Sequence, residues 1–135
     1  MVRSGSTFPD QVRGRALELF PGDTPVVDLL LDQRVAAGIG NVYKSEVLFV
    51  TRRSPLLQLH DLTREDIYEL YRTAGVLLNE NLTGGVRRTR PDDGHGPLWV
   101  YGRAARPCLI CGTAVRRDRL GRNPRSTYWC PGCQG

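Results

Sequence analysis

Residues 31–49 read LDQRVAAGIGNVYKSEVLF, and this stretch decides the fold of the helical part of the chain. Its centre is the sequence GIGN at residues 38–41, in which two glycines surround one apolar residue. The spacing of the apolar residues on either side predicts a helix over residues 25–36 and another over residues 41–51. Thr24 is the expected N-cap of the first helix, because a proline follows it at the first helical position. The stretch therefore predicts two helices joined by a tight glycine turn.

The glycine turn has the chemistry of a phosphate-binding site. Gly38 and Gly40 permit a sharp turn and the close approach of another backbone. The first amides of the following helix would point outward as free donors, and the helix dipole favours an anion there. Asn41 can cap this helix or donate its side-chain amide to a phosphate. The same four residues also fit an ordinary connection between two helices, so their interpretation depends on the rest of the chain.

Two further helices are predicted around this pair. Apolar residues at helical spacing predict one helix over residues 10–20 and another over residues 64–80. Thr63 and Asp66 resemble a capping box at the start of the latter, with Asp in place of the usual Glu or Gln. Together the four predicted helices are enough to enclose an apolar core.

Four cysteines form a C-x2-C…C-x2-C pattern near the C-terminus: Cys108, Cys111, Cys130 and Cys133. Two such pairs can surround one tetrahedral Zn²⁺, because a gap of two residues lets both thiolates of a pair reach one ion from a tight turn. The alternative is two disulfide bonds in a secreted protein, but the chain starts without the apolar segment of a secretion signal. Four protein ligands leave no position for water, so the predicted zinc is structural. Its binding energy of about 10–16 kcal/mol would stabilise a segment too short to fold by apolar burial alone.

Charge is distributed unevenly along the 135 residues, which carry a formal net charge of +5. Residues 1–85 carry a net charge of −2, whereas residues 86–135 hold ten arginines and three acidic residues and carry +7. A cluster of arginines is typical of a surface that binds phosphates, most often those of nucleic acid. The alternative is a solvated basic surface without a partner. No apolar run approaches the ~18 residues that would cross a membrane.

These patterns divide the chain into predicted units. Residues 1–9 are a flexible N-terminus or a cloning remnant, and residues 10–82 form the helical body. Residues 83–97 are rich in Gly, Pro, Asp and Arg, which predicts a flexible basic linker. Residues 98–135 form a zinc-binding β-hairpin, and Leu98–Tyr101 is expected to be a short strand at its start. The predicted fold class is mainly α, with a small four-cysteine, zinc-binding β-hairpin after the helices.

The two motifs together resemble one known family. Residues 31–49 resemble the helix–two-turn–helix signature of the formamidopyrimidine-DNA glycosylase / endonuclease VIII family. The sequences VYGR at 100–103, PCLICGT at 107–113 and RSTYWCPGCQ at 125–134 resemble the zinc finger of that family. The likeness covers about residues 10–134 and corresponds to the C-terminal half of the family. The gap between the cysteine pairs is slightly longer than usual, which predicts a longer hairpin tip.

The resemblance implies base-excision repair of oxidised bases in duplex DNA. Such a DNA glycosylase and AP lyase flips the damaged nucleotide out of the helix and then nicks the backbone. In the family, the turn asparagine and a zinc-finger arginine bind phosphates beside the flipped nucleotide, and these positions match Asn41 and Arg125. Gly38, Gly40 and Lys44 belong to the same DNA-binding turn and helix. By composition alone, Arg125 would be one solvated arginine among ten.

The resemblance also implies one structural Zn²⁺ on the four cysteines and double-stranded, damaged DNA as the partner. It implies a bacterial protein of the cytoplasm that associates with the nucleoid and has no membrane partner. A monomer is the default oligomeric state.

The sequence departs from the family at the nucleophile. The family uses the amine of an N-terminal proline followed by Glu in a β-rich domain, whereas this chain begins Met1-Val2-Arg3 and has its first proline at Pro9. We therefore expect no catalytic residue here, and expect a truncated relative or fragment that binds DNA beside a missing N-terminal catalytic domain.

Two alternatives remain open, so whether the chain is an enzyme is also open at this point. One is a free-standing zinc-ribbon module that binds protein or RNA. The other is an active lyase that uses Lys44, the only lysine, as its amine nucleophile. Within the resemblance, the better interpretation of Lys44 is a solvated or phosphate-facing side chain.

Overall fold

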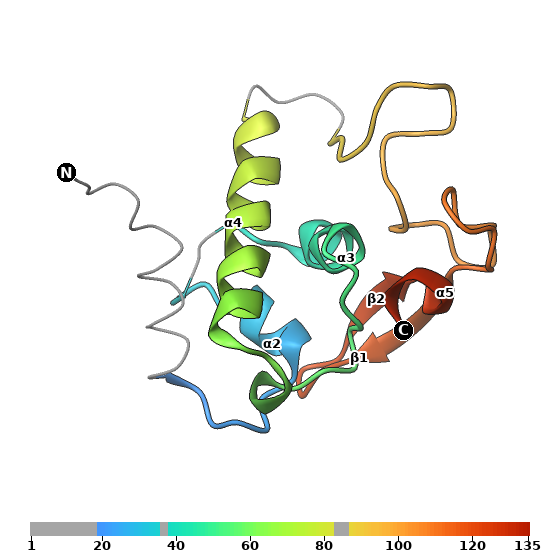
Figure 1. The fold of residues 1–135 in the computed structure, drawn as a ribbon. Helices are drawn as coiled ribbons and strands as arrows, with labels where there is room; N and C mark the ends of the chain where they lie inside the picture. The colour runs from blue at the N-terminus through green and yellow to red at the C-terminus, as the bar shows by residue number, and fades with distance from the viewer. Residues whose placement is uncertain (1–18, 36–37, 83–86) are drawn as a thin grey trace.

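The computed structural model describes residues 19–35, 38–82 and 87–135 (Figure 1). The elements in chain order are α2 (Val26–Leu31), α3 (Asn41–Val50), the 3-10 helix η1 (Leu59–Asp61), α4 (Arg64–Glu80), β1 (Arg116–Leu120), β2 (Arg125–Trp129) and α5 (Pro131–Gln134). Helix α3 lies between α4 and the β-hairpin and contacts α2, α4, β2 and α5. The prediction of a helical body followed by a small β-hairpin is confirmed.

Helix α3 is buried along nearly its whole length. Every residue from Val42 to Phe49 is buried, including the three consecutive polar residues Lys44, Ser45 and Glu46. A helix buried on all sides is normally apolar, and buried polar groups require hydrogen-bond partners. The three polar side chains of α3 therefore form hydrogen bonds, and these bonds join α3 to the C-terminal part of the chain.

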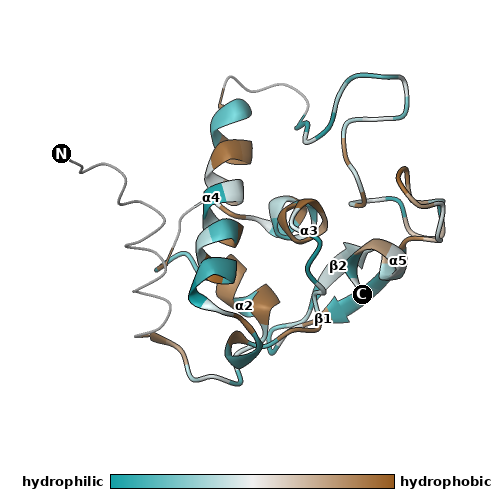
Figure 2. Cartoon of the chain, in the orientation of Figure 1, coloured by the Kyte–Doolittle hydropathy of each residue, from teal (hydrophilic) through white to brown (hydrophobic). Residues whose placement is uncertain are grey.

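The helical body has a core formed by α2, α3 and α4. Figure 2 shows apolar and hydrophilic residues alternating along α4, as expected for a helix with one buried face. The capping box predicted at its start is confirmed, because the Asp66 amide donates to Thr63 Oγ1 at 3.0 Å and the Thr63 amide donates to Asp66 Oδ2 at 2.8 Å. Tyr71 is fully buried, and its hydroxyl donates to the Leu29 carbonyl at 3.1 Å.

A second core joins α3 to the cysteine-bearing segment. It contains Phe49, Val100, Cys108, Val115 and Cys130. Partly buried rings pack around it, and the Phe49 ring stacks on the Trp99 ring with centroids 5.3 Å apart. Because α3 contributes to both cores, the hairpin is fixed to the helical body by apolar contacts as well as by hydrogen bonds.

The strands β1 and β2 pair antiparallel, with Arg116 opposite Trp129 and Leu120 opposite Arg125. The tip between them folds back onto the helical body. The Arg122 amide donates to Asp28 Oδ2 at 2.9 Å, and its guanidinium pairs with Asp23 at 3.1 Å. The tip thus has a structural role, since it attaches the hairpin to α2.

The predicted helix over residues 25–36 is too long at both ends. Helix α2 ends at Leu31, because the Asp32 carboxylate accepts from the Arg34 amide at 2.8 Å and offers the backbone a local alternative to the helix. Thr24 does not cap the helix, since its hydroxyl donates to the Pro21 carbonyl at 2.7 Å. The helix predicted over residues 10–20 lies almost entirely outside the described residues.

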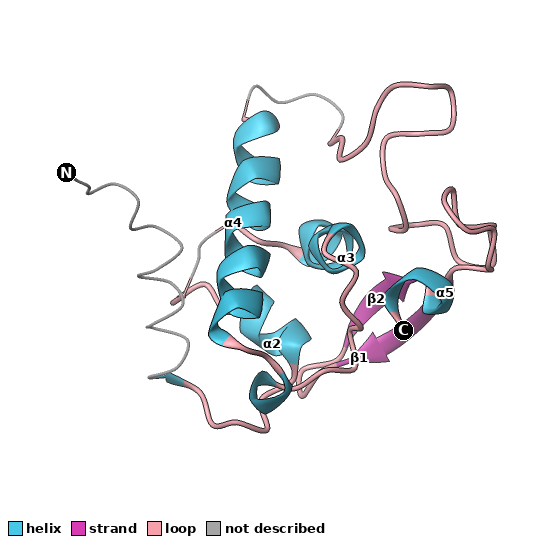
Figure 3. Cartoon of the chain, in the orientation of Figure 1, coloured by secondary structure: helices cyan, strands magenta, loops and turns pink. Residues whose placement is uncertain are grey.

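The strand predicted at Leu98–Tyr101 is not formed, and Figure 3 shows this segment as loop. Its backbone amides donate to the Glu46 carboxylate of α3 instead of to a neighbouring strand. The described part of the expected linker, residues 87–97, also has defined contacts, because the Arg90 guanidinium pairs with Asp93 at 2.8 Å and lies over the Trp99 ring at 4.7 Å. The division into a body, a linker and a zinc unit stays a prediction.

Candidate nucleic-acid interface and metal centre

The glycine turn is shaped by one glycine and one side chain. Gly38 has a φ of +98°, a left-handed conformation that residues with a Cβ rarely adopt. The Gln33 side chain spans the turn, because its Oε1 accepts from the Gly38 amide at 2.9 Å and its Nε2 donates to the Ile39 carbonyl at 3.2 Å. Ile39 is buried in the helical core and anchors the turn from below. Sequence reasoning missed Gln33, since nothing in the local pattern distinguishes it from a solvated glutamine.

The start of α3 is open to a ligand. Gly40 is the N-cap and is exposed, and a Cβ built there would meet nothing within 4 Å. Among the described residues, no side chain caps this helix, and its first turn contains no acidic residue. Free amides at the positive end of a helix dipole attract an anion. The geometry therefore leaves room for a phosphate, and phosphate binding at this turn stays a prediction.

Asn41 connects this turn to the hairpin. Its Nδ2 donates to the Ser126 carbonyl at 2.8 Å, which joins residues that are 85 positions apart in the chain. Its Oδ1 accepts from Lys44 Nζ at 2.5 Å. A side-chain amide nitrogen carries two hydrogens, so one hydrogen of Nδ2 remains for a further acceptor.

Lys44 lies beneath Asn41 rather than in solvent. Its side chain is fully buried, and its Nζ also donates to the Ser126 carbonyl at 3.1 Å. Burial, and then the nearby positive charge of Arg125, lower the pKa of Lys44 to about 8, while the negative charge of Asp28 acts in the opposite direction. The expectation of a solvated ammonium is therefore not met.

Arg125 stands at the start of β2 and is exposed. It directly precedes Ser126, the residue whose carbonyl both Asn41 and Lys44 bind. The structure thus brings Asn41, Lys44 and Arg125 together from two distant segments. Gly38 and Gly40 lie on the same turn, so the five predicted residues form one region, which we call the turn–finger site.

The outer edge of β2 is covered by α3. Ser45 Oγ accepts from the Tyr128 amide at 3.2 Å, two residues along the strand from the Ser126 carbonyl. An uncovered strand edge would leave unpaired backbone groups, and here the side chains of α3 pair with them. Sequence reasoning missed Ser45, because a serine in a helix carries no sign of a strand 83 positions away.

Glu46 holds the segment that leads into the cysteines. Its buried carboxylate accepts from the amides of Trp99, Val100 and Tyr101 at 2.7–3.0 Å and from the Thr89 hydroxyl. Sequence reasoning missed Glu46. The available signal was an acidic residue within a run of otherwise inward-facing positions.

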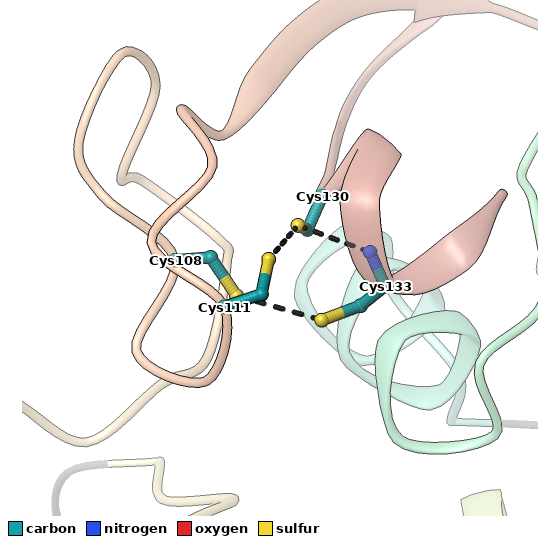
Figure 4. A group of neighbouring side chains, drawn as sticks. All are labelled: Cys108, Cys111, Cys130 and Cys133. Carbon is teal, nitrogen blue, oxygen red and sulfur yellow. Dashed lines mark hydrogen bonds between the residues drawn. The ribbon is translucent and has the colours of Figure 1, made fainter.

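The four cysteines converge from two segments, as Figure 4 shows. Their Sγ atoms all lie within 4.8 Å of one another, with Cys108 and Cys133 at 3.8 Å and Cys111 and Cys130 at 3.3 Å. Zinc–sulfur bonds of about 2.3 Å place sulfurs about 3.8 Å apart in a tetrahedron. All four cysteines are free, so the alternative of two disulfides is not met. The cluster can therefore hold one metal ion.

The surroundings of these thiols shift their pKa values in opposite directions. Burial, and then the neighbouring thiols, raise the pKa of Cys133 to about 12. Hydrogen bonding with the side chain and backbone of Thr113 lowers the pKa of Cys111 to about 6. Four thiolates at such short distances repel one another unless a cation lies between them, so a divalent soft metal is the group that this donor set suits.

Comparisons with known proteins agree with this architecture. Residues 17–90 match the formamidopyrimidine-DNA glycosylase H2TH domain. The probable endonuclease 8 2 of Streptomyces coelicolor is 46% identical over 130 residues, which cover 93% of this chain and 47% of that protein. The DNA-(apurinic or apyrimidinic site) lyase Nei2 of Mycolicibacterium smegmatis is 45% identical over 113 residues, which cover 83% of this chain and 43% of that protein.

Solved structures give the same result. The MutM (Fpg) protein of Thermus thermophilus superposes with a TM-score of 0.74 and 35% identity, covering 98% of this chain and 52% of that one. A MutM in complex with DNA containing carbocyclic 8-oxo-G superposes with a TM-score of 0.72 and 25% identity, covering 98% of this chain and 46% of that one.

A helix–two-turn–helix body joined to a four-cysteine hairpin is the architecture defined by these findings. The chain belongs to the formamidopyrimidine-DNA glycosylase / endonuclease VIII family. It spans about half the length of the curated relatives that it matches. Among residues 19–35, 38–82 and 87–135, no helix has the length and apolar character needed to cross a membrane.

Proposed function

We propose that this chain is the DNA-binding half of a base-excision-repair DNA glycosylase and AP lyase that acts on oxidised bases. It binds the phosphates of duplex DNA around a flipped nucleotide. The observation that carries the proposal is the turn–finger site, where Asn41, beside the open start of α3, donates to the carbonyl of Ser126, the residue that follows the exposed Arg125. The +7 charge of residues 86–135 supports a polyanionic partner.

The parts of the site have complementary roles toward a phosphate. The amides of α3 and the second hydrogen of Asn41 Nδ2 are neutral donors that fix the position of the phosphate oxygens. The Arg125 guanidinium supplies the positive charge and can bind two oxygens at once. These donors carry no base specificity, so the site positions the duplex and leaves the choice of lesion to other contacts.

The bound metal is proposed to be one structural Zn²⁺ held by the four cysteine thiolates. It would fix the two C-x2-C turns and so the end of β2, which Cys130 directly follows. We also propose that the protein is a monomer that acts on nucleoid DNA in the bacterial cytoplasm.

We propose that the described residues bind DNA and carry out no catalytic step. An amine that forms a Schiff base must reach the sugar aldehyde with a free electron pair. Lys44 is the only lysine, and its Nζ is buried and donates to Asn41 and Ser126. We therefore propose that Lys44 is not a nucleophile and that the 135-residue polypeptide does not nick DNA by itself.

Borohydride trapping tests the role of Lys44 as a nucleophile. The chain is mixed with abasic-site DNA and sodium borohydride, which reduces any imine formed between an amine and the sugar aldehyde to a stable secondary amine. We expect no covalent adduct through Lys44 in denaturing electrophoresis. An adduct that forms with the wild-type chain and disappears in Lys44→Met would show that Lys44 is an active amine.

Two substitutions test the DNA-binding proposal. Asn41→Ala removes one neutral hydrogen bond and is expected to weaken duplex binding about tenfold. Arg125→Ala removes a charged, bidentate contact and is expected to weaken it about 10- to 100-fold. The slope of log affinity against log salt should fall by about 0.9 in Arg125→Ala and stay constant in Asn41→Ala, because only arginine neutralises a phosphate. Fluorescence anisotropy with a labelled duplex measures both quantities.

The matched control is Arg72→Ala, which removes an exposed arginine from α4. It changes the net charge by the same amount as Arg125→Ala, and its salt slope is expected to equal that of the wild type. Equal losses in the two arginine variants would mean that the chain binds DNA only through its overall charge.

A further inference from the structure

We infer that Lys44 is a positioning residue, which holds the Asn41 amide and the first residues of β2 in the arrangement that binds phosphate without itself touching DNA. This inference rests on the proposed function, since it explains how the turn–finger site is kept in place. Part of the DNA affinity then depends on Lys44, although this residue is buried.

The Asn41 amide is held in one orientation by its two hydrogen-bond partners. A lysine ammonium can only donate hydrogen bonds and a carbonyl oxygen can only accept them. Lys44 Nζ lies 2.5 Å from Asn41 Oδ1, and the Ser126 carbonyl lies 2.8 Å from Asn41 Nδ2. If the amide were rotated so that its oxygen and nitrogen exchanged places, the nitrogen would face Lys44 Nζ and the oxygen would face the Ser126 carbonyl. Both hydrogen bonds would then be lost. The Asn41 amide therefore has one stable orientation, and its second N–H hydrogen has a fixed direction.

Lys44 also binds the backbone of the hairpin. The Ser126 carbonyl accepts from both Asn41 and Lys44, at 2.8 Å and 3.1 Å. Arg125 is the preceding residue, so these two hydrogen bonds fix the backbone next to the guanidinium-bearing residue. One ammonium group thus holds both proposed phosphate contacts, one on α3 and the other on β2.

The buried charge of Lys44 is not needed for the stability of the fold. The ammonium is fully buried and lies near the positive charge of Arg125. Burying a charge is costly, and replacing a buried ionic group by an apolar residue of similar volume is often neutral or stabilising. Methionine, which has a flexible unbranched side chain, suits this position. A positioning role thus predicts that Lys44→Met weakens DNA binding without lowering the melting temperature.

The experiment compares Lys44→Met with Ser45→Ala and the wild type by anisotropy with duplex DNA across a salt series. Ser45→Ala is the matched control, because it removes another hydrogen bond between α3 and β2 without touching Asn41. We expect Lys44→Met to bind about tenfold more weakly with an unchanged salt slope, and Ser45→Ala to stay within about twofold of the wild type. Wild-type affinity in Lys44→Met, or a slope lower by about 0.9, would overturn the inference, because the latter indicates a direct phosphate contact.

A double-substitution cycle shows whether Lys44 acts through Asn41. In an Asn41→Ala background, Lys44→Met is expected to reduce affinity by no more than about threefold, because the amide that it orients is gone. Fully additive losses would contradict the inference.

An NMR measurement without DNA separates this inference from the proposed function. The side-chain amide signal of Asn41 is expected to shift in Lys44→Met and to keep its position in Ser45→Ala. An unshifted signal in Lys44→Met would overturn the positioning role even if the wild type binds duplex DNA. A wild type that fails to bind duplex DNA would overturn the proposed function, whatever the amide signal shows.

Discussion

Removing the metal with a chelator is expected to unfold the β-hairpin and to abolish duplex binding. A two-stranded hairpin is at best marginally stable in water, and here two metal-ligand candidates, Cys108 and Cys130, also form part of the second core. Structural zinc contributes about 10–16 kcal/mol in small zinc-binding units, which is comparable to the whole stability of a typical domain. Loss of the ion should therefore release β2 and with it Arg125 from α3.

The measurement combines metal analysis with amide hydrogen exchange. The purified chain should contain one zinc per polypeptide, and chelation should remove protection from the β1 and β2 amides while the α4 amides remain protected. Adding zinc back should restore both protection and DNA binding. Cys130→Ser should behave like the chelated chain and should not respond to zinc. A chelated chain that keeps a protected hairpin and binds duplex DNA would contradict the structural role of the metal.

Replacing Glu46 is expected to cause a loss of stability as large as truncating a large core side chain. Its carboxylate accepts from three consecutive backbone amides, of Trp99, Val100 and Tyr101, and from the Thr89 hydroxyl. Glu46→Ala leaves these donors buried without a partner, at about 1–3 kcal/mol each for groups that water cannot reach. Some donors will regain water, so we expect a total loss of about 3–5 kcal/mol.

Urea unfolding followed by circular dichroism measures this loss. Glu69→Ala is the matched control, because Glu69 is a half-exposed acid of α4 that pairs with Arg53 at 2.5 Å. Such an ion pair contributes at most about 1 kcal/mol. Glu46→Gln keeps one acceptor oxygen but turns an amide group toward backbone donors, so its stability should lie between those of Glu46→Ala and the wild type. A cost below about 1 kcal/mol in Glu46→Ala would show that other contacts hold the segment.

Features encoded over a few residues could be predicted from the sequence. The capping box needs only Thr63 and Asp66, and the metal cluster needs only the C-x2-C spacing, which fixes two sulfurs of one turn. Both depend on contacts between residues three positions apart, where local geometry leaves little freedom. The helices α3 and α4 were predicted to within one residue at each end for the same reason.

Contacts between distant segments could not be predicted. The resemblance placed Asn41 and Arg125 in one site. Nothing in either motif indicated that the Asn41 side chain binds the carbonyl of Ser126, the residue after Arg125. The three polar residues of α3 appear in sequence as part of an amphipathic helix with a polar side. In the structure this side faces the hairpin and the segment before it, so that Lys44 is buried rather than solvated.

The failed prediction of a strand at Leu98–Tyr101 has the same cause. The apolar and aromatic residues of this segment fit a strand, but a strand requires a neighbouring strand to pair with its amides. The Glu46 carboxylate occupies that position, and a carboxylate accepts from several amides without imposing strand geometry. The early end of α2 has a local cause instead. The Asp32 side chain accepts a hydrogen bond from the Arg34 amide, and this ends the helix earlier than the apolar periodicity predicts.

Competition between nucleic acids tests the central claim, that this half of the protein binds duplex DNA through its phosphates, most directly. The zinc-loaded chain is titrated with a labelled abasic-site duplex at increasing salt, with unlabelled single-stranded RNA of equal length as competitor. We predict that affinity for the duplex falls steeply with salt, by about 0.9 log units per log unit of salt for each phosphate neutralised, and that RNA competes weakly. RNA that competes as well as the duplex, or a duplex that does not bind, would contradict the claim and would favour a zinc-ribbon module with another partner.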